Sequence, residues 1–359
     1  MTKTETIKFS KIILNWYDFN ARKLPWRIEP KNSKKGILIN PYHTLVSEFM
    51  LQQTSVKTVI PYFKNFIQKW PSIEKLSNAS EDEVLSEWAG LGYYSRARNL
   101  IKCSIILREK FNNTLPSNLH YLQNLPGVGP YTAAAIRSIA FNQPAVVIDG
   151  NVERVISRLF CIEKPVKSSK KLIYCLTDQV TCKKRPGDFA QALMDIGATI
   201  CNSKKPKCNI CPLLKHCKAY KNNLTLSIPH KEKKKKKPTR YGYAFFCIFK
   251  KKYLILEKRP ENGLLGGMMS LPTSDWKERK EIVNIPKIFT NYHEIKGDIS
   301  HSFSHFNLKL KVLIIKKNQL PKNMKIQKIT ELDLKSFPKI FQKIINHALN
   351  SDYLNNLKN

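Results

Sequence analysis

The sequence has few acidic residues and lacks the long hydrophobic runs of a membrane protein. Apolar stretches such as residues 244–249 fall far short of the ~20 residues that a membrane-spanning helix needs. The N-terminus does not combine a charged start with a long apolar stretch, so we find no secretory signal. Aromatic residues form 10% of the chain and apolar runs recur throughout, which excludes a disordered protein. We therefore expect a folded protein that stays in the cytoplasm.

The charge of the chain is strongly one-sided. Lys and Arg number 62 against 27 for Asp and Glu, so the 359-residue chain carries a formal net charge of +35. Such an excess is typical of proteins that bind a polyanion, which means nucleic acid or, less readily, an anionic membrane surface. A Lys-rich proteome, in which Lys replaces other polar surface residues, would produce the same composition. The lysine run at 233–237 is compatible with both explanations.

The pattern of apolar residues predicts two domains of different kinds, so the expected fold class is multidomain, α followed by α+β. Helical spacing dominates the first part of the chain. We expect helices over residues 44–58, 81–87, 131–141 and 151–160. Residues 229–240 are basic and contain two prolines, as a linker does. Strand-like runs follow at 241–250, 253–258 and 305–315.

Nine cysteines are present, and an odd number in a long cytoplasmic chain argues against a disulfide framework. Four of them lie within 17 residues, namely Cys201, Cys208, Cys211 and Cys217. Four thiolates this close in sequence can surround one metal centre. Zinc sites usually show two close pairs separated by a longer loop, whereas a [4Fe–4S] cluster also takes four cysteines and tolerates uneven spacing. Four free thiols in a basic loop are the less favoured alternative, because exposed cysteine is rare.

A glycine-containing turn precedes the helix expected at 131–141. It reads Leu-Pro-Gly-Val-Gly-Pro-Tyr over residues 125–131. Gly127 and Gly129 allow the backbone to approach a partner closely, and the helix N-terminus offers free N–H groups and a positive end. The turn is therefore suited to a phosphodiester, although a Gly-x-Gly sequence before a helix is more commonly only a tight turn.

Two carboxylates suggest catalysis. Asp149 stands where an apolar run ends and a helix begins, the usual place of a structural N-cap, and a helix N-terminus also favours the ionised carboxylate. Glu48 lies among apolar residues on the helix expected at 44–58. Burial there would raise the pKa of Glu48, as a general acid requires. The alternative is that Glu48 is an ordinary exposed residue on the polar face of the helix. One acid that donates a proton and one that stays negative are what glycosidic bond cleavage through an oxocarbenium-like transition state needs.

Together these motifs resemble the adenine-specific mismatch DNA glycosylases of the MutY type, a family of the helix–hairpin–helix superfamily. The matching segments occur in the expected order from about residue 15 to about residue 310. They are residues 25–27, 47–54, 90–99, 125–131, 149–151 and 189–197, the four-cysteine segment and residues 301–305. Each motif alone is weakly specific, but the ordered set with its cysteine spacing is highly specific.

The resemblance implies an all-helical helix–hairpin–helix glycosylase region at 1–228 with an iron–sulfur cluster loop at 201–217, a basic linker at 229–240 and a Nudix-like α+β domain at 241–350. It also implies a monofunctional enzyme of base excision repair. Such an enzyme flips an adenine paired with 8-oxoguanine or guanine out of the duplex, hydrolyses its N-glycosidic bond and leaves an abasic site. The implied partner is double-stranded DNA, bound by a monomer in the nucleoid, and the implied cofactor is a [4Fe–4S] cluster.

The same resemblance assigns roles to individual residues. The implied catalytic set is Glu48, which protonates adenine, Asp149, which stabilises the oxocarbenium-like sugar, and the neighbouring Tyr131 and Asn151. The adenine pocket would be lined by Trp26, Arg27 and Asp195. Gln53 and Tyr93 would insert into the base stack beside the remaining base, with Thr54 and Leu91 close to that base. The oxidised guanine would be read by Phe303, Ser304 and His305. The DNA backbone would contact Gly127 and Gly129, and the cluster ligands would be Cys201, Cys208, Cys211 and Cys217.

The sequence also bears on three alternatives. An endonuclease III-type glycosylase–lyase needs a lysine nucleophile in the hairpin helix, where this chain has Tyr131. A Nudix-type nucleotide hydrolase needs an acidic Gly-x5-Glu-x7-Arg-Glu box, which we do not find. A DNA-binding module without activity remains an alternative, because the motifs do not establish that Glu48 and Asp149 meet. The loop between Arg27 and Pro41 is longer than is usual for the family, which leaves the entrance of the adenine pocket undefined.

Overall fold

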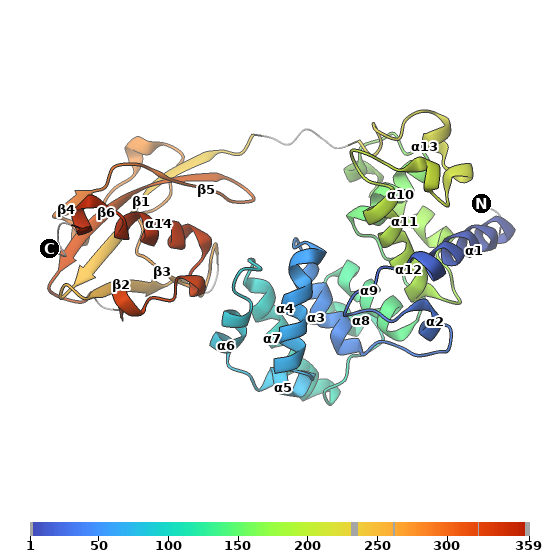
Figure 1. Ribbon diagram of the computed structural model, residues 1–359, viewed down its shortest axis with the longest axis horizontal. Helices are drawn as coiled ribbons and strands as arrows, with labels where there is room; N and C mark the ends of the chain where they lie inside the picture. The colour runs from blue at the N-terminus through green and yellow to red at the C-terminus, as the bar shows by residue number, and fades with distance from the viewer. Residues whose placement is uncertain (1–2, 231–235, 261–262, 322, 356–359) are drawn as a thin grey trace. The chain divides into compact units, whose positions relative to one another are not determined.

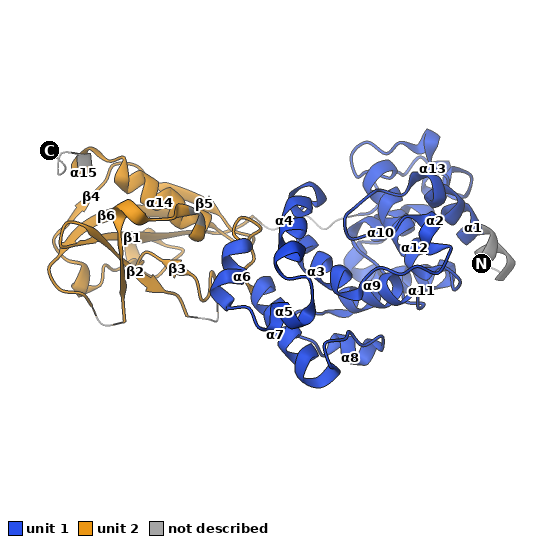
Figure 2. Ribbon diagram, turned by 60° about the horizontal axis from the view of Figure 1, so that its bottom comes forward, with its two compact units in different colours: residues 1–87, 96–233 blue, residues 88–95, 234–359 orange. Residues whose placement is uncertain are grey.

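The computed structural model describes residues 3–230, 236–260, 263–321 and 323–355. The chain divides into two compact units, which Figure 2 colours separately. Unit 1 comprises Met1–Glu87 and Arg96–Lys233, and unit 2 comprises Trp88–Ser95 and Lys234–Asn359. The linker expected at 229–240 includes residues 231–235, which lie outside the described residues. These residues contain the first part of the lysine run at 233–237.

Unit 1 consists of α-helices joined by short turns (Figure 1). Its longer helices are α1 (Lys3–Asn20), α3 (Pro41–Leu51), α4 (Val56–Lys69), α7 (Ser95–Phe111), α9 (Pro130–Phe141), α10 (Gly150–Leu159), α11 (Val166–Val180) and α12 (Pro186–Asp195). Its shorter helices are α2 (Pro30–Ser33), α5 (Ile73–Ser77), α6 (Glu81–Glu87), α8 (Leu119–Gln123) and α13 (Lys218–Lys221). A π-helical turn, Ile196–Ile200, continues α12. None of the described helices has the length and hydrophobicity of a membrane span.

The helices expected at 81–87, 131–141 and 151–160 are confirmed by α6, α9 and α10, within one residue at each end. The first residues of α9 and α10 have identifiable starting signals. Gly129 caps α9 and is followed by a proline at the first helical position, where a missing N–H costs nothing. Asp149 caps α10 through its side chain, so the predicted N-cap role of this residue is confirmed.

The single helix expected over 44–58 is wrong. α3 ends at Leu51, and α4 begins at Val56 behind an N-cap formed by Ser55. Between the two helices Gln53 has a φ of 58°, in the left-handed region that interrupts a right-handed helix. The apolar pattern continues through this break, which is why periodicity alone did not find it.

α1, α10, α11 and α12 share one hydrophobic core. Tyr17 of α1, Ile156 of α10 and Phe189 of α12 are each at most 1% exposed in it. Figure 1 shows these four helices gathered together. Their close packing fixes the start of α10 relative to the end of α12, and both ends border the cavity described below.

Unit 2 contains a mixed sheet. Its strands are β1 (Thr239–Phe249), β2 (Tyr253–Lys258), β3 (Met269–Ser270), β4 (Tyr292–Glu294), β5 (Ile299–Ser302), β6 (Asn307–Lys317) and β7 (Lys325–Lys328). The order is β3-β2-β1-β6-β4, with β7 also paired to β2 and β5 also paired to β6. β1 and β6 run parallel from the pair Thr239 and Asn307 to the pair Phe249 and Lys317, and the other pairings are antiparallel. The three predicted strand-like runs therefore correspond to β2 and, shifted by up to two residues, to β1 and β6.

Both faces of this sheet are buried at its centre. Along β1, Ala244 and Phe246 belong to one hydrophobic cluster, and Phe245 and Cys247 belong to the cluster on the opposite face. This alternation follows from the two-residue period of a strand. Helix α14 (Lys339–Leu349) lies over the first face (Figure 1), and its apolar side chains belong to the same cluster. The α+β character expected for this part of the chain is confirmed.

Candidate active site

Unit 1 contains a cavity of about 400 Å³ between α3, α9, α10, α12 and the segment that follows α1. Its wall includes eight residues that the sequence motifs single out: Trp26, Arg27, Glu48, Gln53, Thr54, Tyr131, Asp149 and Asn151. The wall also includes residues that sequence analysis did not select, among them Arg22, Thr44 and Gln191. A cavity of this size falls in the range of small-ligand sites, on the order of 300–1,000 Å³.

Glu48 is the buried acid of this cavity. It lies on α3 and is only 7% exposed. Its pKa is raised to about 7, primarily by burial; the Tyr131 hydrogen bond and the Arg27 guanidinium lower it, and the charge of Asp149 raises it. A carboxyl group with a pKa near neutral pH can hold a proton and deliver it to a leaving group.

Tyr131 orients this acid. It stands in the first turn of α9, and its hydroxyl donates a hydrogen bond to the Glu48 carboxyl group. Burial, reinforced by the charges of Glu48 and Asp149, holds the pKa of Tyr131 well above its usual range. The phenol therefore remains a neutral hydrogen-bond donor, and it fixes one oxygen of Glu48 while the other can face the cavity.

Asp149 presents a carboxylate that is already supplied with donors. Its Oδ1 accepts the backbone N–H groups of Asn151 at 2.9 Å and Val152 at 2.7 Å, and its Oδ2 accepts the Asn151 side-chain amide at 2.8 Å. These bonds place the Asp149 carboxyl group at the N-terminus of α10, where it caps the helix. The structure thus brings Glu48 and Asp149 to one cavity, where Glu48 has a pKa near 7 and Asp149 accepts three hydrogen bonds.

Two arginines form a further part of the wall. Arg27 donates through Nη1 to both oxygens of Asp195, at 2.9 and 2.8 Å, and Arg22 donates to the same carboxylate through its backbone N–H and its Nε. Asp195 is fully buried and is not among the residues that line the cavity, so it lies behind the arginines and fixes them. Sequence analysis predicted Asp195 in the wall itself and missed Arg22. Trp26 packs edge-to-face on Phe63, with ring centroids 5.3 Å apart.

The turn after α3 is held by a residue from α7. The buried Arg96 donates through Nη1 to the carbonyl oxygens of Phe49, Met50 and Gln52, at 2.6–2.9 Å, and through Nη2 to the Thr54 hydroxyl at 3.2 Å. It thereby satisfies the last carbonyls of the helix, which lack partners within it. This long-range cap explains the break between α3 and α4 and places the wedge candidate Gln53, with its neighbour Thr54, at the cavity rim.

Arg154 connects α10 to the cysteine segment. Its Nη2 donates to the Asn151 side-chain oxygen at 3.0 Å and to the Gly197 carbonyl at 2.6 Å, and its Nε donates to the Cys201 carbonyl at 2.7 Å. Gly197 permits this arrangement, because a Cβ there would lie 2.6 Å from the Asn151 Cβ. Sequence analysis did not select Arg154, although it lies one turn after Asp149-Gly-Asn151.

Arg158, one turn further along α10, binds the cysteine segment directly. It is 2% exposed and donates to the carbonyl oxygens of Asn202 at 2.7 Å and Ser203 at 3.1 Å. Its Nη1 also lies 3.4 Å from the Cys201 sulfur. Burial raises the pKa of the Cys208 thiol overall, although the Arg158 guanidinium acts to lower it.

The four cysteines lie near enough to influence one another's ionisation. Burial raises the pKa of the Cys211 thiol to about 11. Within the described ranges, no group of three or more His, Cys, Asp or Glu side chains is arranged to hold a metal ion. The donor set itself, four cysteine sulfurs beside a buried arginine, is chemically suited to an iron–sulfur cluster, in which each thiolate binds a separate iron.

The glycine turn before α9 has two distinct parts. Gly127 has a φ of +77°, and a Cβ there would lie 2.7 Å from the Phe49 ring and 2.8 Å from the Asn99 Cβ. A side chain is therefore excluded at Gly127. At Gly129 a Cβ would meet nothing within 4 Å, so the backbone at the start of α9 faces open space. A phosphate can approach that backbone.

In unit 2 the residues expected to read the lesion lie on the turn between β5 and β6. Phe303 packs against His301, Phe306 and Trp276. Ser304 and His305 are exposed. The other wedge candidate, Tyr93, also belongs to unit 2, as does Leu91. Leu91 is buried, whereas Tyr93 is 47% exposed and its hydroxyl lies 2.9 Å from the Ser304 hydroxyl.

Two family models match the chain. Residues 46–176 match the model described as HhH-GPD superfamily base excision DNA repair protein, and residues 244–347 match the model of the NUDIX domain. Among solved structures, that of a thermostable thymine-DNA glycosylase aligns with a TM-score of 0.54 and 27% identity, covering 61% of this chain and 98% of that one. A trapped endonuclease III–DNA covalent intermediate aligns with a TM-score of 0.50 and 23% identity, over 62% and 99% of the two chains, and supports the fold alone. The helix–hairpin–helix and Nudix-like fold prediction is confirmed.

Curated relatives span most of the chain. The adenine DNA glycosylase of Buchnera aphidicola subsp. Baizongia pistaciae is 40% identical over 307 residues, which cover 84% of each protein. That of Buchnera aphidicola subsp. Schizaphis graminum is 37% identical over 94% of this chain and 97% of its own length. The human adenine DNA glycosylase is 33% identical over 86% of this chain and 67% of its own length. With the buried acid, the capped carboxylate and the two domain types in place, the chain belongs to the adenine DNA glycosylase family, within the helix–hairpin–helix base excision repair superfamily.

Proposed function

We propose that this protein removes adenine mispaired with 8-oxoguanine or guanine in duplex DNA by hydrolysing the N-glycosidic bond. The observation that carries the proposal is the pair formed by Glu48 and Asp149 on one cavity wall. Glu48 has a pKa of about 7, whereas Asp149 is surrounded by donors to its anion. Two acids in such different environments can divide the work of acid and anion between them.

In the proposed reaction the adenine is flipped out of the stack into the cavity. Glu48 donates its proton to the base, so the electron pair of the breaking C1′–N9 bond leaves on a neutral adenine. Positive charge develops on the sugar, and the Asp149 carboxylate stabilises it electrostatically. Water then adds to C1′ and releases a proton, which leaves an abasic site and free adenine. Tyr131 and Asn151 hold the two carboxyl groups in place throughout.

Substrate recognition is divided between the two units in this proposal. Trp26 and Arg27 contact the extruded adenine, with Asp195 fixing Arg27 from behind. The wedge residues Gln53 and Tyr93, supported by Thr54 and Leu91, occupy the gap in the base stack. The lesion is read by Phe303, Ser304 and His305, and the backbone at Gly127 and Gly129 binds phosphate.

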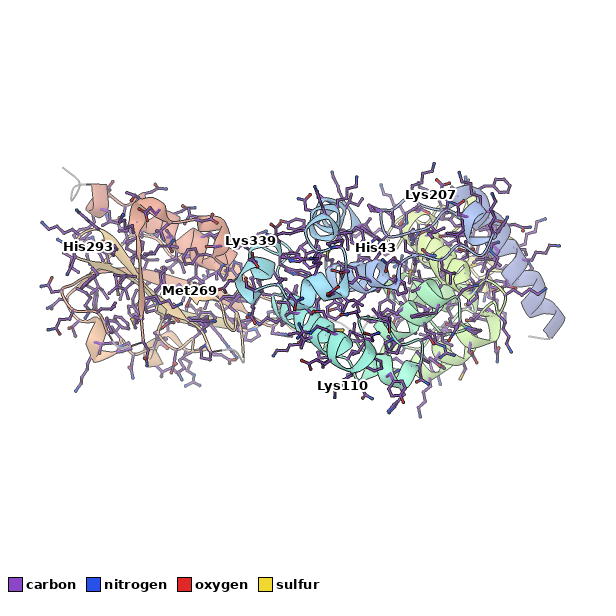
Figure 3. All side chains as sticks on the ribbon, turned by 90° about the horizontal axis from the view of Figure 1, so that it is seen from below. His43, Lys110, Lys207, Met269, His293 and Lys339 are labelled. Carbon is purple, nitrogen blue, oxygen red and sulfur yellow. The ribbon has the colours of Figure 1, made fainter. Side chains whose placement is uncertain are left out.

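The cofactor proposal is a [4Fe–4S] cluster held by Cys201, Cys208, Cys211 and Cys217. When bound, the cluster would cross-link the loop and stabilise its conformation. Lys204, Lys205 and Lys207 between the first two cysteines are exposed, and Figure 3 labels Lys207 on the surface of unit 1. A loop fixed in this way would present these lysines to DNA phosphates.

The alternative of a glycosylase–lyase is disfavoured by the cavity. Among its described wall residues there is no lysine, and the hairpin position is occupied by Tyr131, which hydrogen-bonds Glu48. A Schiff base needs an amine nucleophile. We therefore expect a monofunctional enzyme. We also propose that it acts as a monomer on double-stranded DNA.

The direct test incubates the protein with a duplex containing one 8-oxoguanine:A pair and then cleaves abasic sites with alkali. We expect strand scission only after alkali and only at the adenine. Scission without alkali, or efficient borohydride trapping of a covalent complex, would support the lyase instead. Duplex binding with intact adenine would identify a DNA-binding module without activity.

A further inference from the structure

One hydroxyl group in the wall of the cavity has no partner. Thr44 lies on α3 one turn before Glu48, so both side chains lie on the same face of the helix. It is 2% exposed and lines the cavity, yet its Oγ1 makes no hydrogen bond among the described residues. Ser47, beside it on the same wall, is different, because its hydroxyl donates to the Thr44 backbone carbonyl at 3.0 Å. A hydroxyl that lines a cavity and has no protein partner is free to bond to a ligand there.

A second buried oxygen in the same wall is also unpaired. Gln191 of α12 donates through Nε2 to the Gly187 carbonyl at 3.2 Å, and its Oε1 has no partner in the described part of the chain. The bond to a carbonyl fixes which end of the amide is nitrogen, so Oε1 is an acceptor. Two donors in the wall, by contrast, are engaged: Arg27 Nη1 with Asp195 and the Tyr131 hydroxyl with Glu48.

The unpaired buried atoms that this wall offers are thus oxygens. An exocyclic amino group complements them, because it carries two N–H donors and both oxygens can accept. A carbonyl oxygen could be paired only by the Thr44 hydroxyl, since the Gln191 Oε1 cannot donate. Adenine carries such an amino group at C6, and the oxo purines carry a carbonyl there.

We propose that Thr44 is a specificity residue that contacts the extruded base, with its hydroxyl accepting a hydrogen bond from the exocyclic amino group of adenine. The inference rests on the proposed function, since it names the atom by which the same site recognises its base.

The test compares Thr44→Val, which keeps the shape and removes the hydroxyl, with Thr44→Ser, which keeps the hydroxyl. Single-turnover release is measured from 8-oxoguanine duplexes that carry either adenine or unsubstituted purine, in which hydrogen replaces the amino group. We expect Thr44→Val to slow adenine release about tenfold, to leave purine release within twofold of the parent, and Thr44→Ser to retain most of the adenine rate. If the parent releases adenine alone, the comparison of Val and Ser on adenine decides.

Thermal melts of the same variants show whether the Thr44 hydroxyl contacts the base or instead stabilises the fold. Removing an unpaired hydroxyl should leave the Tm of Thr44→Val equal to or above that of the parent. The matched control is Thr177→Val, which removes a buried hydroxyl that donates to the Ile173 carbonyl at 2.7 Å and lies outside the cavity. That variant should lower the Tm and leave the adenine-to-purine ratio unchanged.

The outcomes distinguish a failure of the role proposed for Thr44 from a failure of the proposed function. Equal losses on adenine and purine, a lowered Tm in Thr44→Val, or an unchanged adenine rate would each overturn the role of Thr44 while leaving the proposed function intact. A parent protein that releases no adenine would instead refute the proposed function, and the role of Thr44 with it.

Discussion

The cavity of unit 1 and the β5–β6 turn of unit 2 both carry residues expected to recognise DNA, but they hold their side chains in different ways. Glu48, Asp149 and Tyr131 are tied to one another or to helix termini, and Glu48 is almost completely buried. Ser304 and His305 are exposed on a short turn. The contrast fits the proposed roles, because a proton donor acts more strongly where water is excluded, whereas a group that reads the opposite base must stay accessible.

A difference in burial predicts a difference in the size of mutational effects. Charges and protons act through a low local dielectric in the cavity, so each change there alters the transition state strongly. Hydrogen bonds made by exposed groups compete with water and contribute less. The following variants test this ordering.

The largest effect is expected for Glu48→Gln, which keeps the shape and removes the proton donor. We expect adenine release to fall by about 10²–10⁴-fold while duplex binding is retained. Single-turnover base release and a binding titration measure the two quantities. The exposed Glu74→Gln serves as the matched control and should match the parent in both. Adenine excision by Glu48→Gln at the parental rate would remove Glu48 from the mechanism.

Asp149→Asn should come next, with release slowed by about 10²–10³-fold, because the amide cannot stabilise positive charge on the sugar. Asparagine caps helices as well as aspartate does, so the Tm should stay close to that of the parent. Asp149→Ala also loses the cap and should lower the Tm. If Asn and Ala are equally slow and equally unstable, Asp149 would have a structural role alone.

The pH profile gives a smaller and graded effect. Because burial raises the pKa of Glu48 to about 7, the protonated form is lost as pH rises through 7, and the rate should fall about tenfold per pH unit above it. The folded pKa lies above the unfolded one, so this group makes stability decrease as pH rises from its ordinary range through 7. Melts of the parent against Glu48→Gln should show that slope only in the parent. A rate that is flat between pH 6 and pH 9 would contradict the assignment.

The smallest effect is expected from the double change of Ser304 and His305 to Ala. We expect the ratio of rates on 8-oxoguanine:A and G:A duplexes to narrow by about tenfold, with the G:A rate nearly unchanged. Paired single-turnover measurements on the two duplexes give this ratio. An equal loss on both would assign the turn to general DNA binding, and an unchanged ratio would exclude it as the lesion reader.

The parts of the fold that local rules determine could be predicted from the sequence. Asp149 at the end of an apolar run is an N-cap as expected, and α6, α9 and α10 begin and end within one residue of their predicted positions. The β1 and β6 runs were also found, although nothing local indicates that they pair in parallel. The candidate site was outlined by motifs, which identified eight residues of the cavity wall.

The remainder depends on contacts between distant segments. The break after α3 is set by Arg96, whose guanidinium binds carbonyls more than 40 residues earlier. Arg22, Arg154 and Arg158 were missed, because a chain with 62 lysines and arginines gives no local reason to single out three of them. Thr44 was missed for a related reason, since an unpaired hydroxyl can be recognised only when all its neighbours are in place.

The carboxylate of Asp195 fastens the segment containing Arg22 and Arg27 to the end of α12, across 173 and 168 residues of chain respectively. During synthesis the N-terminal segment leaves the ribosome long before α12 exists, so its two guanidinium groups lack their counter-ion until α12 has been made. A nascent chain that ends before α12 lacks the side of the cavity that α12 forms. The enzyme can thus be competent only after almost the whole helical unit has been translated.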